Sequence, residues 1–285
     1  MNRLGVALTR EPPLGHPLAD TPSMKLNYRE YGAYREDRPT LILLHGLLGS
    51  SSNWHSIARA LEPDYHLIVP DLRNHGSSPH DPEGGYPALA EDVAALIDDH
   101  GLESVILIGH SMGGKAAMWL SLQQPELVDG LVVVDVSPVR YPNRFGTIFD
   151  ALCSLDLESL QDRSQADDEL ARLLEPKALR NYLLQNLVQE KGRWRWRVNL
   201  DAIGRNLERI IGFPDVSDSS QYLGPVQFLY GGNSDYVLPE HEKIIRDAFP
   251  FARLRSIAGA GHWVYSEKPE QFLQALQGFL QKELI

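Results

Sequence analysis

The sequence predicts an α/β protein built on a mostly parallel, doubly wound sheet with a helical insertion. Short apolar runs rich in Val, Ile and Leu each end in a turn signal, which is typical of buried parallel strands. Helical periodicity fills the intervals between these runs, and strands that alternate with helices form a sheet covered on both faces. Between residues 139 and 223 the alternation stops, and amphipathic helical stretches replace it.

The expected strands follow from the apolar runs, taken in chain order. The first stretch has strand-like content, and the later ones are continuous apolar runs. They are Leu26–Tyr31, Leu41–Leu44, Tyr65–Val69, Val105–Ile108, Leu131–Val134, Val226–Tyr230 and Arg253–Ile257. Continuous rather than alternating apolar character favours strands that are buried on both faces.

Four helices are predicted between these strands from apolar spacing and from end signals. They are Leu89–Asp99, Met112–Gln124, Pro239–Phe249 and Pro269–Leu280. Gly101 is a suitable C-cap for the first and Pro125 ends the second, whereas the last two begin with a proline in the first turn. Within the insertion we expect helical stretches at Leu170–Leu174 and Leu179–Val188.

These elements predict one α/β core that is interrupted by a cap. Residues 1–23 contain four prolines and no periodicity, so we expect an irregular N-terminal arm. Residues 24–138 and 224–285 are expected to form the core, and residues 139–223 the helical cap. The cap charge is uneven, with an acidic first part and a basic second part that includes the alternating R-W-R-W-R stretch.

Composition excludes several classes of protein. The 285 residues carry 38 acidic and 27 basic side chains, and a net charge of −11 disfavours nucleic acids and anionic membranes as partners. The single cysteine, Cys153, cannot form an internal disulfide or a multi-cysteine metal site, and we expect it to be a small buried side chain. No apolar run reaches the length of a membrane span and no leader pattern is present, so the expected location is the cytoplasm.

The strongest functional signal is G-H-S-M-G at residues 109–113, which follows a predicted strand and opens a predicted helix. A serine hydroxyl is a poor nucleophile until a base takes its proton, and a tight turn lifts Ser111 away from the strand end. Gly109 and Gly113 leave room for that turn. The backbone N–H of Met112 then points to the position where an oxyanion would develop. The pattern predicts a nucleophilic serine.

Two further motifs supply the partners that such a serine needs. H-G-L-L-G-S at residues 45–50 follows a strand and can direct the Leu47 N–H at the same oxyanion. G-A-G-H-W at residues 259–263 places His262 on a glycine-rich loop, where its ordinary pKa near neutrality suits a general base. We expect substrate contacts from four aromatic side chains beside these motifs or in the cap, namely His45, His110, Trp263 and Trp196.

The acid that orients the histidine is ambiguous in the sequence. Asp135 and Asp235 each follow a predicted strand, and ligands of doubly wound sheets gather at these carboxyl ends. Either carboxylate could therefore reach His262 and stabilise its imidazolium form. Asp71 also follows a strand, but its surroundings are typical of turn construction.

At these motifs the chain resembles the α/β-hydrolase family, and more closely the YbfF-type esterases and their mitochondrial abhydrolase relatives. The resemblance runs from about residue 24 to the C-terminus. It is carried by HGLLGS, DLRNHGSS, GHSMGGK, VDVSPV and GAGHWV in this order, and by WRVNLDA and YLGP. It implies an α/β-hydrolase fold and a serine carboxylesterase that cleaves short-to-medium acyl esters through an acyl-enzyme, without a cofactor. A small ester or thioester is then the expected partner.

The resemblance does not close the choice of acid. Most α/β-hydrolases place the acid at the position of Asp235, whereas the YbfF-type enzymes place it at the position of Asp135, which we slightly prefer. Asp201, in the cap, is a third candidate. Two alternatives to an esterase remain open: an acyl-CoA thioesterase of the same fold, and a ligand-binding protein with slow turnover. Serine at the turn excludes the dehalogenases and epoxide hydrolases of this fold, which use a carboxylate there.

Overall fold

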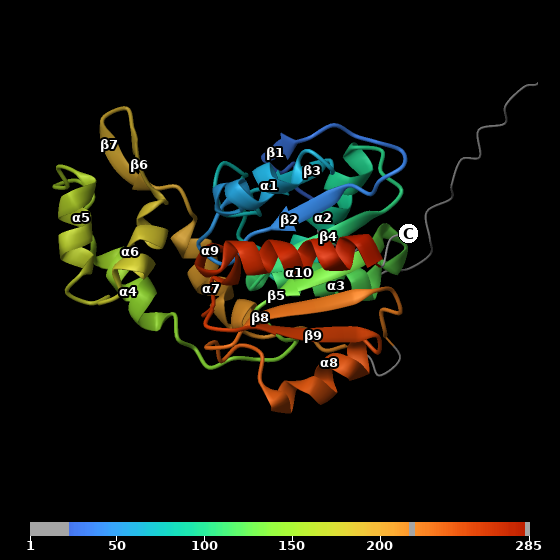
Figure 1. Ribbon diagram of the computed structural model, residues 1–285. Helices are drawn as coiled ribbons and strands as arrows, with labels where there is room; N and C mark the ends of the chain where they lie inside the picture. The colour runs from blue at the N-terminus through green and yellow to red at the C-terminus, as the bar shows by residue number, and fades with distance from the viewer. Residues whose placement is uncertain (1–22, 217–219, 283–285) are drawn as a thin grey trace, which may run out of the picture.

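The computed structural model describes residues 23–216 and 220–282, with a seven-stranded sheet at its centre (Figure 1). The spatial order is β1-β3-β2-β4-β5-β8-β9. The strands are β1 (Tyr28–Tyr31), β2 (Leu41–Leu44), β3 (Leu67–Pro70), β4 (Val105–His110), β5 (Val128–Val134), β8 (Val226–Gly231) and β9 (Ala252–Ile257). Only β1 is antiparallel to its neighbour among these described strands, so the prediction of a mostly parallel sheet is confirmed. The predicted N-terminal arm, apart from Ser23, lies outside the described residues.

Helices cover both faces of the sheet, as predicted for a doubly wound fold. Side chains of one face pack against α2 (Tyr86–Asp99), α3 (Met112–Gln123) and α8 (Glu242–Ala248). The opposite face packs against α1 (His55–Leu61), α9 (Val264–Glu267) and α10 (Pro269–Lys282). The sequence analysis missed α1 and α9, which are short and carry few periodic apolar positions. Strands β2, β3 and β4 are buried throughout, whereas β1 is an exposed edge strand.

The segment between β5 and β8 carries four helices and a hairpin, and we call its residues 139–223 the cap, of which the structure describes 139–216 and 220–223. Its elements are α4 (Gly146–Ser154), α5 (Arg163–Leu170), α6 (Lys177–Leu184), β6 (Leu187–Glu190), β7 (Arg193–Trp196) and α7 (Leu200–Ile211). Figure 1 shows α4, α5, α6 and the hairpin beside one end of the sheet, with α7 closer to the core.

The hairpin corrects the expectation of an entirely helical cap. Helix α5 ends at Leu170, so the helix predicted over Leu170–Leu174 is wrong, and the one predicted over Leu179–Val188 runs into β6. Lys191 and Gly192 connect the strands with positive φ angles of 51° and 80°, the geometry of a two-residue primed turn. A further correction concerns Cys153, which is exposed on α4 rather than buried.

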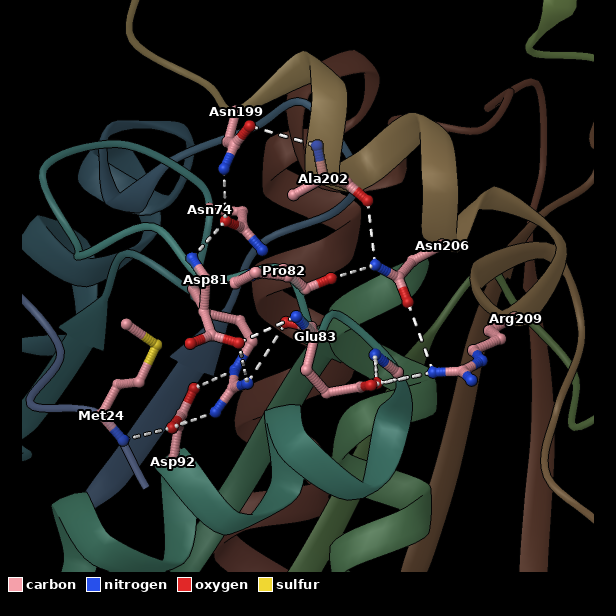
Figure 2. Close-up of polar contacts among 12 residues, drawn as sticks. Met24, Asn74, Asp81, Pro82, Glu83, Asp92, Asn199, Ala202, Asn206 and Arg209 are labelled. Carbon is pink, nitrogen blue, oxygen red and sulfur yellow. Dashed lines mark hydrogen bonds and ion pairs between the residues drawn. The ribbon is translucent and has the colours of Figure 1, made fainter. Parts of the chain in front are cut away.

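Helix α7 is fastened to the loop between β3 and α2 by polar contacts along its length (Figure 2). These contacts join side chains of α7, or of its N-cap, to side chains and carbonyls of the loop. The pairs are Asn199 with Asn74 (3.1 Å), Asn206 with the Pro82 carbonyl (2.7 Å) and Arg209 with Glu83 (2.9 Å). The helix is thereby held against the core over three turns.

The loop that receives α7 is itself held by a buried ion pair (Figure 2). Both nitrogens Nε and Nη2 of Arg73 contact the Asp92 carboxylate, at 2.6 and 2.7 Å, and the two side chains are almost fully buried. Asp92 also accepts a hydrogen bond from the Met24 N–H at 2.6 Å. A bidentate pair of this kind fixes the geometry of both partners.

Lys115 ties the two ends of the cap to helix α3. Its side chain is buried, and its Nζ donates hydrogen bonds to the carbonyls of Val139 (2.8 Å), Ile211 (3.0 Å) and Gly212 (2.6 Å). Val139 is the first residue of the cap, and Ile211 and Gly212 lie at the C-terminal end of α7. Burial, with a smaller contribution from the positive charge of Arg140, lowers the pKa of Lys115 to about 7.

We predict that Lys115 makes folding stability rise with pH between about 7 and 10.5. In this window the unfolded chain keeps the lysine proton, whereas the folded chain has given it up together with one of the three Nζ hydrogen bonds, and the free energy of unfolding increases with pH. Urea unfolding of the wild type and of Lys115→Met checks this. The difference in unfolding free energy, wild type minus variant, should grow by about 1 to 2 kcal/mol over two pH units. Equal pH dependence of the two proteins would contradict the prediction.

Candidate active site

Ser111 occupies a sharp turn between strand β4 and helix α3. Its backbone has φ 52° and ψ −116°, a conformation that a residue with a side chain rarely adopts. The turn is held at both ends, because the Ser111 N–H donates to the Val134 carbonyl (3.0 Å) and the Lys115 N–H donates to the Ser111 carbonyl (3.0 Å). The Ser111 side chain consequently leaves the sheet and lines a cavity between core and cap.

The two glycines of the motif are required by close backbone approach. A Cβ atom on Gly109 would lie 2.3 Å from the Gly113 carbonyl oxygen, and one on Gly113 would lie 2.5 Å from the Leu44 carbonyl oxygen. No real Cβ atom tolerates such distances from backbone. These glycines therefore allow α3 to start directly against the ends of β2 and β4.

His262 is hydrogen-bonded to Asp135, the carboxylate that follows β5. The distance from His262 Nδ1 to Asp135 Oδ2 is 2.7 Å, and Asp135 is fully buried while His262 remains partly exposed. Asp135 Oδ1 accepts the Gly231 N–H (2.8 Å), and Oδ2 also accepts the Ser234 hydroxyl (2.5 Å). With Nδ1 occupied in this way, Nε2 is the His262 ring nitrogen that remains for another partner, and His262 and Ser111 line the same cavity.

The other three acids lie elsewhere. Asp235 forms an ion pair with Arg144 (2.5 Å), and both side chains are more than half exposed. Asp201 is exposed in the first turn of α7. Asp71 accepts main-chain N–H groups of Ser51 (2.7 Å) and Ser77 (2.8 Å), which fits the turn role expected of it. Of the candidates, the structure brings Asp135 alone into contact with His262.

The loop Gly46–Gly49 follows β2, and we call it the oxyanion loop because it carries the predicted donor Leu47. Leu47 and Met112 line a cavity together with Ser111, as the prediction of paired donors requires. The loop closes with a hydrogen bond from the Gly49 N–H to the Gly46 carbonyl (3.0 Å), and Leu48 within it has a positive φ of 60°.

His45 was expected to bind substrate, and the structure corrects this expectation. The side chain is fully buried, with Nδ1 donating to the Gly46 carbonyl (2.8 Å) and Nε2 accepting the Leu72 N–H (3.0 Å). His75 is arranged in the same way, since Nδ1 donates to the Arg73 carbonyl (2.9 Å) and Nε2 accepts the Leu48 N–H (3.1 Å). Both imidazoles act as neutral braces of the loops around the site.

The remaining predicted substrate contacts divide into two groups. His110 and Trp263 line the cavity beside Ser111 and His262, and the His110 Nε2–H also donates to the His262 carbonyl (2.9 Å). Trp196 belongs to β7, where it packs against the apolar core of the cap, and is not one of the described residues that line this cavity.

We call the space next to Ser111 and His262 the cap–core cavity. It has a volume of about 220 Å³, and its wall is mainly apolar. Core and cap both contribute to this wall, through Leu47, Leu48, Phe145, Ile148, Leu179, Tyr182, Leu183 and Trp263. Apart from His262, the charged side chain in the described wall is Arg144. The arginines of the R-W-R-W-R stretch in the hairpin do not line this cavity.

The sequence analysis missed four residues that the structure places at the site. Ser234 contacts Asp135, Tyr236 stacks on His262 with ring centroids 4.0 Å apart, and Tyr182 and Arg144 line the cavity. Ser234 and Tyr236 flank Asp235 in the loop after β8. Their position beside a predicted strand end was a usable signal, whereas nothing local distinguishes Tyr182 or Arg144 from other cap residues.

Comparisons with known proteins identify the family of this chain. A model of the alpha/beta hydrolase fold family matches residues 39–269. The sn-1-specific diacylglycerol lipase ABHD11 of Mus musculus is 41% identical over 250 residues, covering 85% of this chain and 81% of the relative. Esterase YbfF of Escherichia coli strain K12 is 36% identical over 259 residues, covering 90% and 99%. A solved structure described as a marine microorganism esterase superposes with a TM-score of 0.87 at 37% identity, covering 90% of this chain and 100% of the other.

The fold and the site define an enzyme of the hydrolase class. This chain belongs to the α/β-hydrolase family, and the resemblance found in its motifs is confirmed. Among the described residues, no helix is both long and apolar enough to span a bilayer.

We predict that His75 makes the fold sensitive to acid. Burial lowers the pKa of His75 from 6.5 to about 3, so between these values the unfolded chain binds a proton that the folded chain does not. The free energy of unfolding therefore falls as the pH drops through this window. Between pH 7 and pH 5, the free energy of unfolding of the wild type should fall by about 2 kcal/mol more than that of His75→Gln. An equally steep acid loss in His75→Gln would count against this origin.

Proposed function

We propose that this protein is a serine carboxylesterase with Ser111 as nucleophile, His262 as base and Asp135 as the orienting acid. The observation that carries the proposal is the 2.7 Å hydrogen bond between His262 and the buried Asp135, at a cavity that Ser111 also lines. Relatives named as an esterase and as a diacylglycerol lipase support an ester substrate.

The proposed reaction is acyl transfer in two halves. His262 takes the Ser111 proton, and the serine oxygen attacks the ester carbonyl carbon. The N–H groups of Leu47 and Met112 stabilise the oxyanion of the tetrahedral intermediate. His262 then gives its proton to the departing alcohol, and an acyl-enzyme remains. Water that His262 deprotonates attacks the acyl-enzyme, and collapse of the second intermediate returns the proton to Ser111.

Asp135 acts on His262 rather than on the substrate. By accepting the Nδ1 hydrogen, it keeps the imidazole in the tautomer whose Nε2 can accept the serine proton. It also stabilises the imidazolium that forms during attack. The Gly231 N–H and the Ser234 hydroxyl hold the carboxylate in place, so its orientation does not depend on the histidine alone.

The cavity wall supports a short-to-medium acyl chain as the group that is transferred. An apolar chain gains about 0.8 kcal/mol for each methylene that it removes from water. The cap side chains Phe145, Ile148 and Leu183 line the same cavity and would cover such a chain. In this proposal the cap of residues 139–223 sets acyl-chain size, and residues 24–138 with 224–285 supply the catalytic groups.

Exchange of each acid for its amide tests the proposed triad. Asp135→Asn leaves His262 in the wrong tautomer and should lower kcat by up to about 10⁴-fold on p-nitrophenyl butyrate. Asp235→Asn breaks an exposed ion pair and should change kcat by less than about threefold. Ser111→Ala is the reference for lost turnover. A large kcat loss in Asp235→Asn with little loss in Asp135→Asn would overturn the assignment.

Parallel assays on esters and on acyl-CoA separate the remaining alternatives. A carboxylesterase should give a higher kcat/KM for an alkyl ester than for the thioester of the same acyl group. The reverse order would identify a thioesterase that uses the same triad. A stoichiometric burst without further turnover on either substrate would identify a slow, ligand-binding relative.

A further inference from the structure

Two side chains of the cap hold the carbonyl groups of the oxyanion loop. The Tyr182 hydroxyl donates to the Leu47 carbonyl at 2.8 Å, and Asn186 Nδ2 donates to the Leu48 carbonyl at 2.7 Å. Tyr182 lies in α6, and Asn186 follows the end of the same helix. Both contacts join residues more than 130 positions apart, so the cap adds long-range support to the hydrogen bond that closes the loop within its own sequence.

The conformation of the loop needs such outside support. Leu48 is held at φ 60°, which costs a residue with a side chain about 1 to 2 kcal/mol. Its N–H is already occupied by His75 (3.1 Å) from the core side. The loop also passes close under the cap, because a Cβ on Gly49 would lie 2.7 Å from the Tyr182 hydroxyl oxygen.

Tyr182 belongs at the same time to the cavity and to the loop. Its ring lines the cap–core cavity and contacts the Trp263 ring, with centroids 5.5 Å apart. Burial raises the pKa of its hydroxyl well above the ordinary value, so the hydroxyl stays protonated and available as a donor. A substrate chain that packs against this ring touches the residue that holds the Leu47 carbonyl, the group next to the Leu47 N–H on the far side of the same Cα.

We propose that Tyr182 and Asn186 are positioning residues that aim the Leu47 N–H at the oxyanion by fixing the carbonyls on either side of Leu48. The proposal rests on the proposed function, since it assigns the cap a part in stabilising the transition state of ester hydrolysis. An oxyanion donor acts only when it is held before the reaction begins, so loosening the loop costs rate more than substrate binding.

The test compares Tyr182→Phe with Gln185→Ala. Tyr182→Phe removes one hydroxyl and keeps the ring that lines the cavity. Gln185→Ala removes another cap-to-core hydrogen bond from the end of α6, the one to Asn53 (3.2 Å), which does not reach a carbonyl of the oxyanion loop. A general loosening of the cap should affect both variants, whereas a positioning role affects Tyr182→Phe alone.

We expect Tyr182→Phe to lower kcat on p-nitrophenyl butyrate by about 3- to 10-fold while KM changes by less than about twofold. The inhibition constant of a butyl trifluoromethyl ketone, whose adduct with Ser111 carries an oxyanion, should rise by a similar factor. Gln185→Ala should match the wild type in both measurements. Asn186→Ala is a second variant with the same expected separation of kcat from KM, and urea unfolding shows whether each variant is folded.

The proposal is overturned by a Tyr182→Phe variant whose kcat and inhibition constant equal those of the wild type. It is also overturned if Gln185→Ala shows the same losses, or if KM alone changes. Turnover by Ser111→Ala tests the proposed function independently of the positioning role. Loss of turnover in Ser111→Ala together with unaltered Tyr182→Phe rejects the positioning role and leaves the esterase standing, whereas turnover in Ser111→Ala rejects the esterase mechanism itself.

Discussion

The site depends on left-handed backbone at the ends of the central strands. Of the five non-glycine residues with positive φ among those described, four follow β2, β3, β4 and β5: Leu48, Asn74, Ser111 and Asp135. Each such residue costs about 1 to 2 kcal/mol, so the group opposes folding by several kcal/mol. The apolar strands beneath them, buried on both faces, compensate for this cost. In return, Ser111 and Asp135 leave adjacent strands abruptly and project into the same edge of the sheet.

Neutral hydrogen bonds rather than charges fix the loops around the nucleophile. His45 and His75 each use one ring nitrogen as donor and the other as acceptor, an arrangement that requires the neutral imidazole. Burial lowers the pKa of both, which keeps them in that form. His262 can therefore become an imidazolium during catalysis without repulsion from a positive charge on His45 or His75.

Features that depend on residues close together in the chain could be predicted from the sequence. The G-H-S-M-G turn, the buried strands and the histidine loop depend on residues close together in the chain, and each lies where it was expected. The choice between Asp135 and Asp235 depends on how two strand ends meet, which no local pattern records. Trp196 is absent from the described lining of the cavity for a related reason, because the alternating Arg and Trp residues form a hairpin strand whose distance from the cavity is not encoded locally.

The cap contacts the core in two physically different ways. Helix α7 is anchored by buried amide contacts, by Lys115 and by an ion pair to Glu83, whereas α6 reaches the core through the hydrogen bonds to the oxyanion loop and to Asn53. Two hydrogen bonds of this kind contribute about 1 to 3 kcal/mol together. Leu183 and Leu184 of α6 are also buried in the main apolar cluster, so hydrophobic packing adds to these hydrogen bonds in holding the helix. Because α6 both holds the oxyanion loop and lines the cavity, its position determines the shape of the acyl pocket and the support of the loop together.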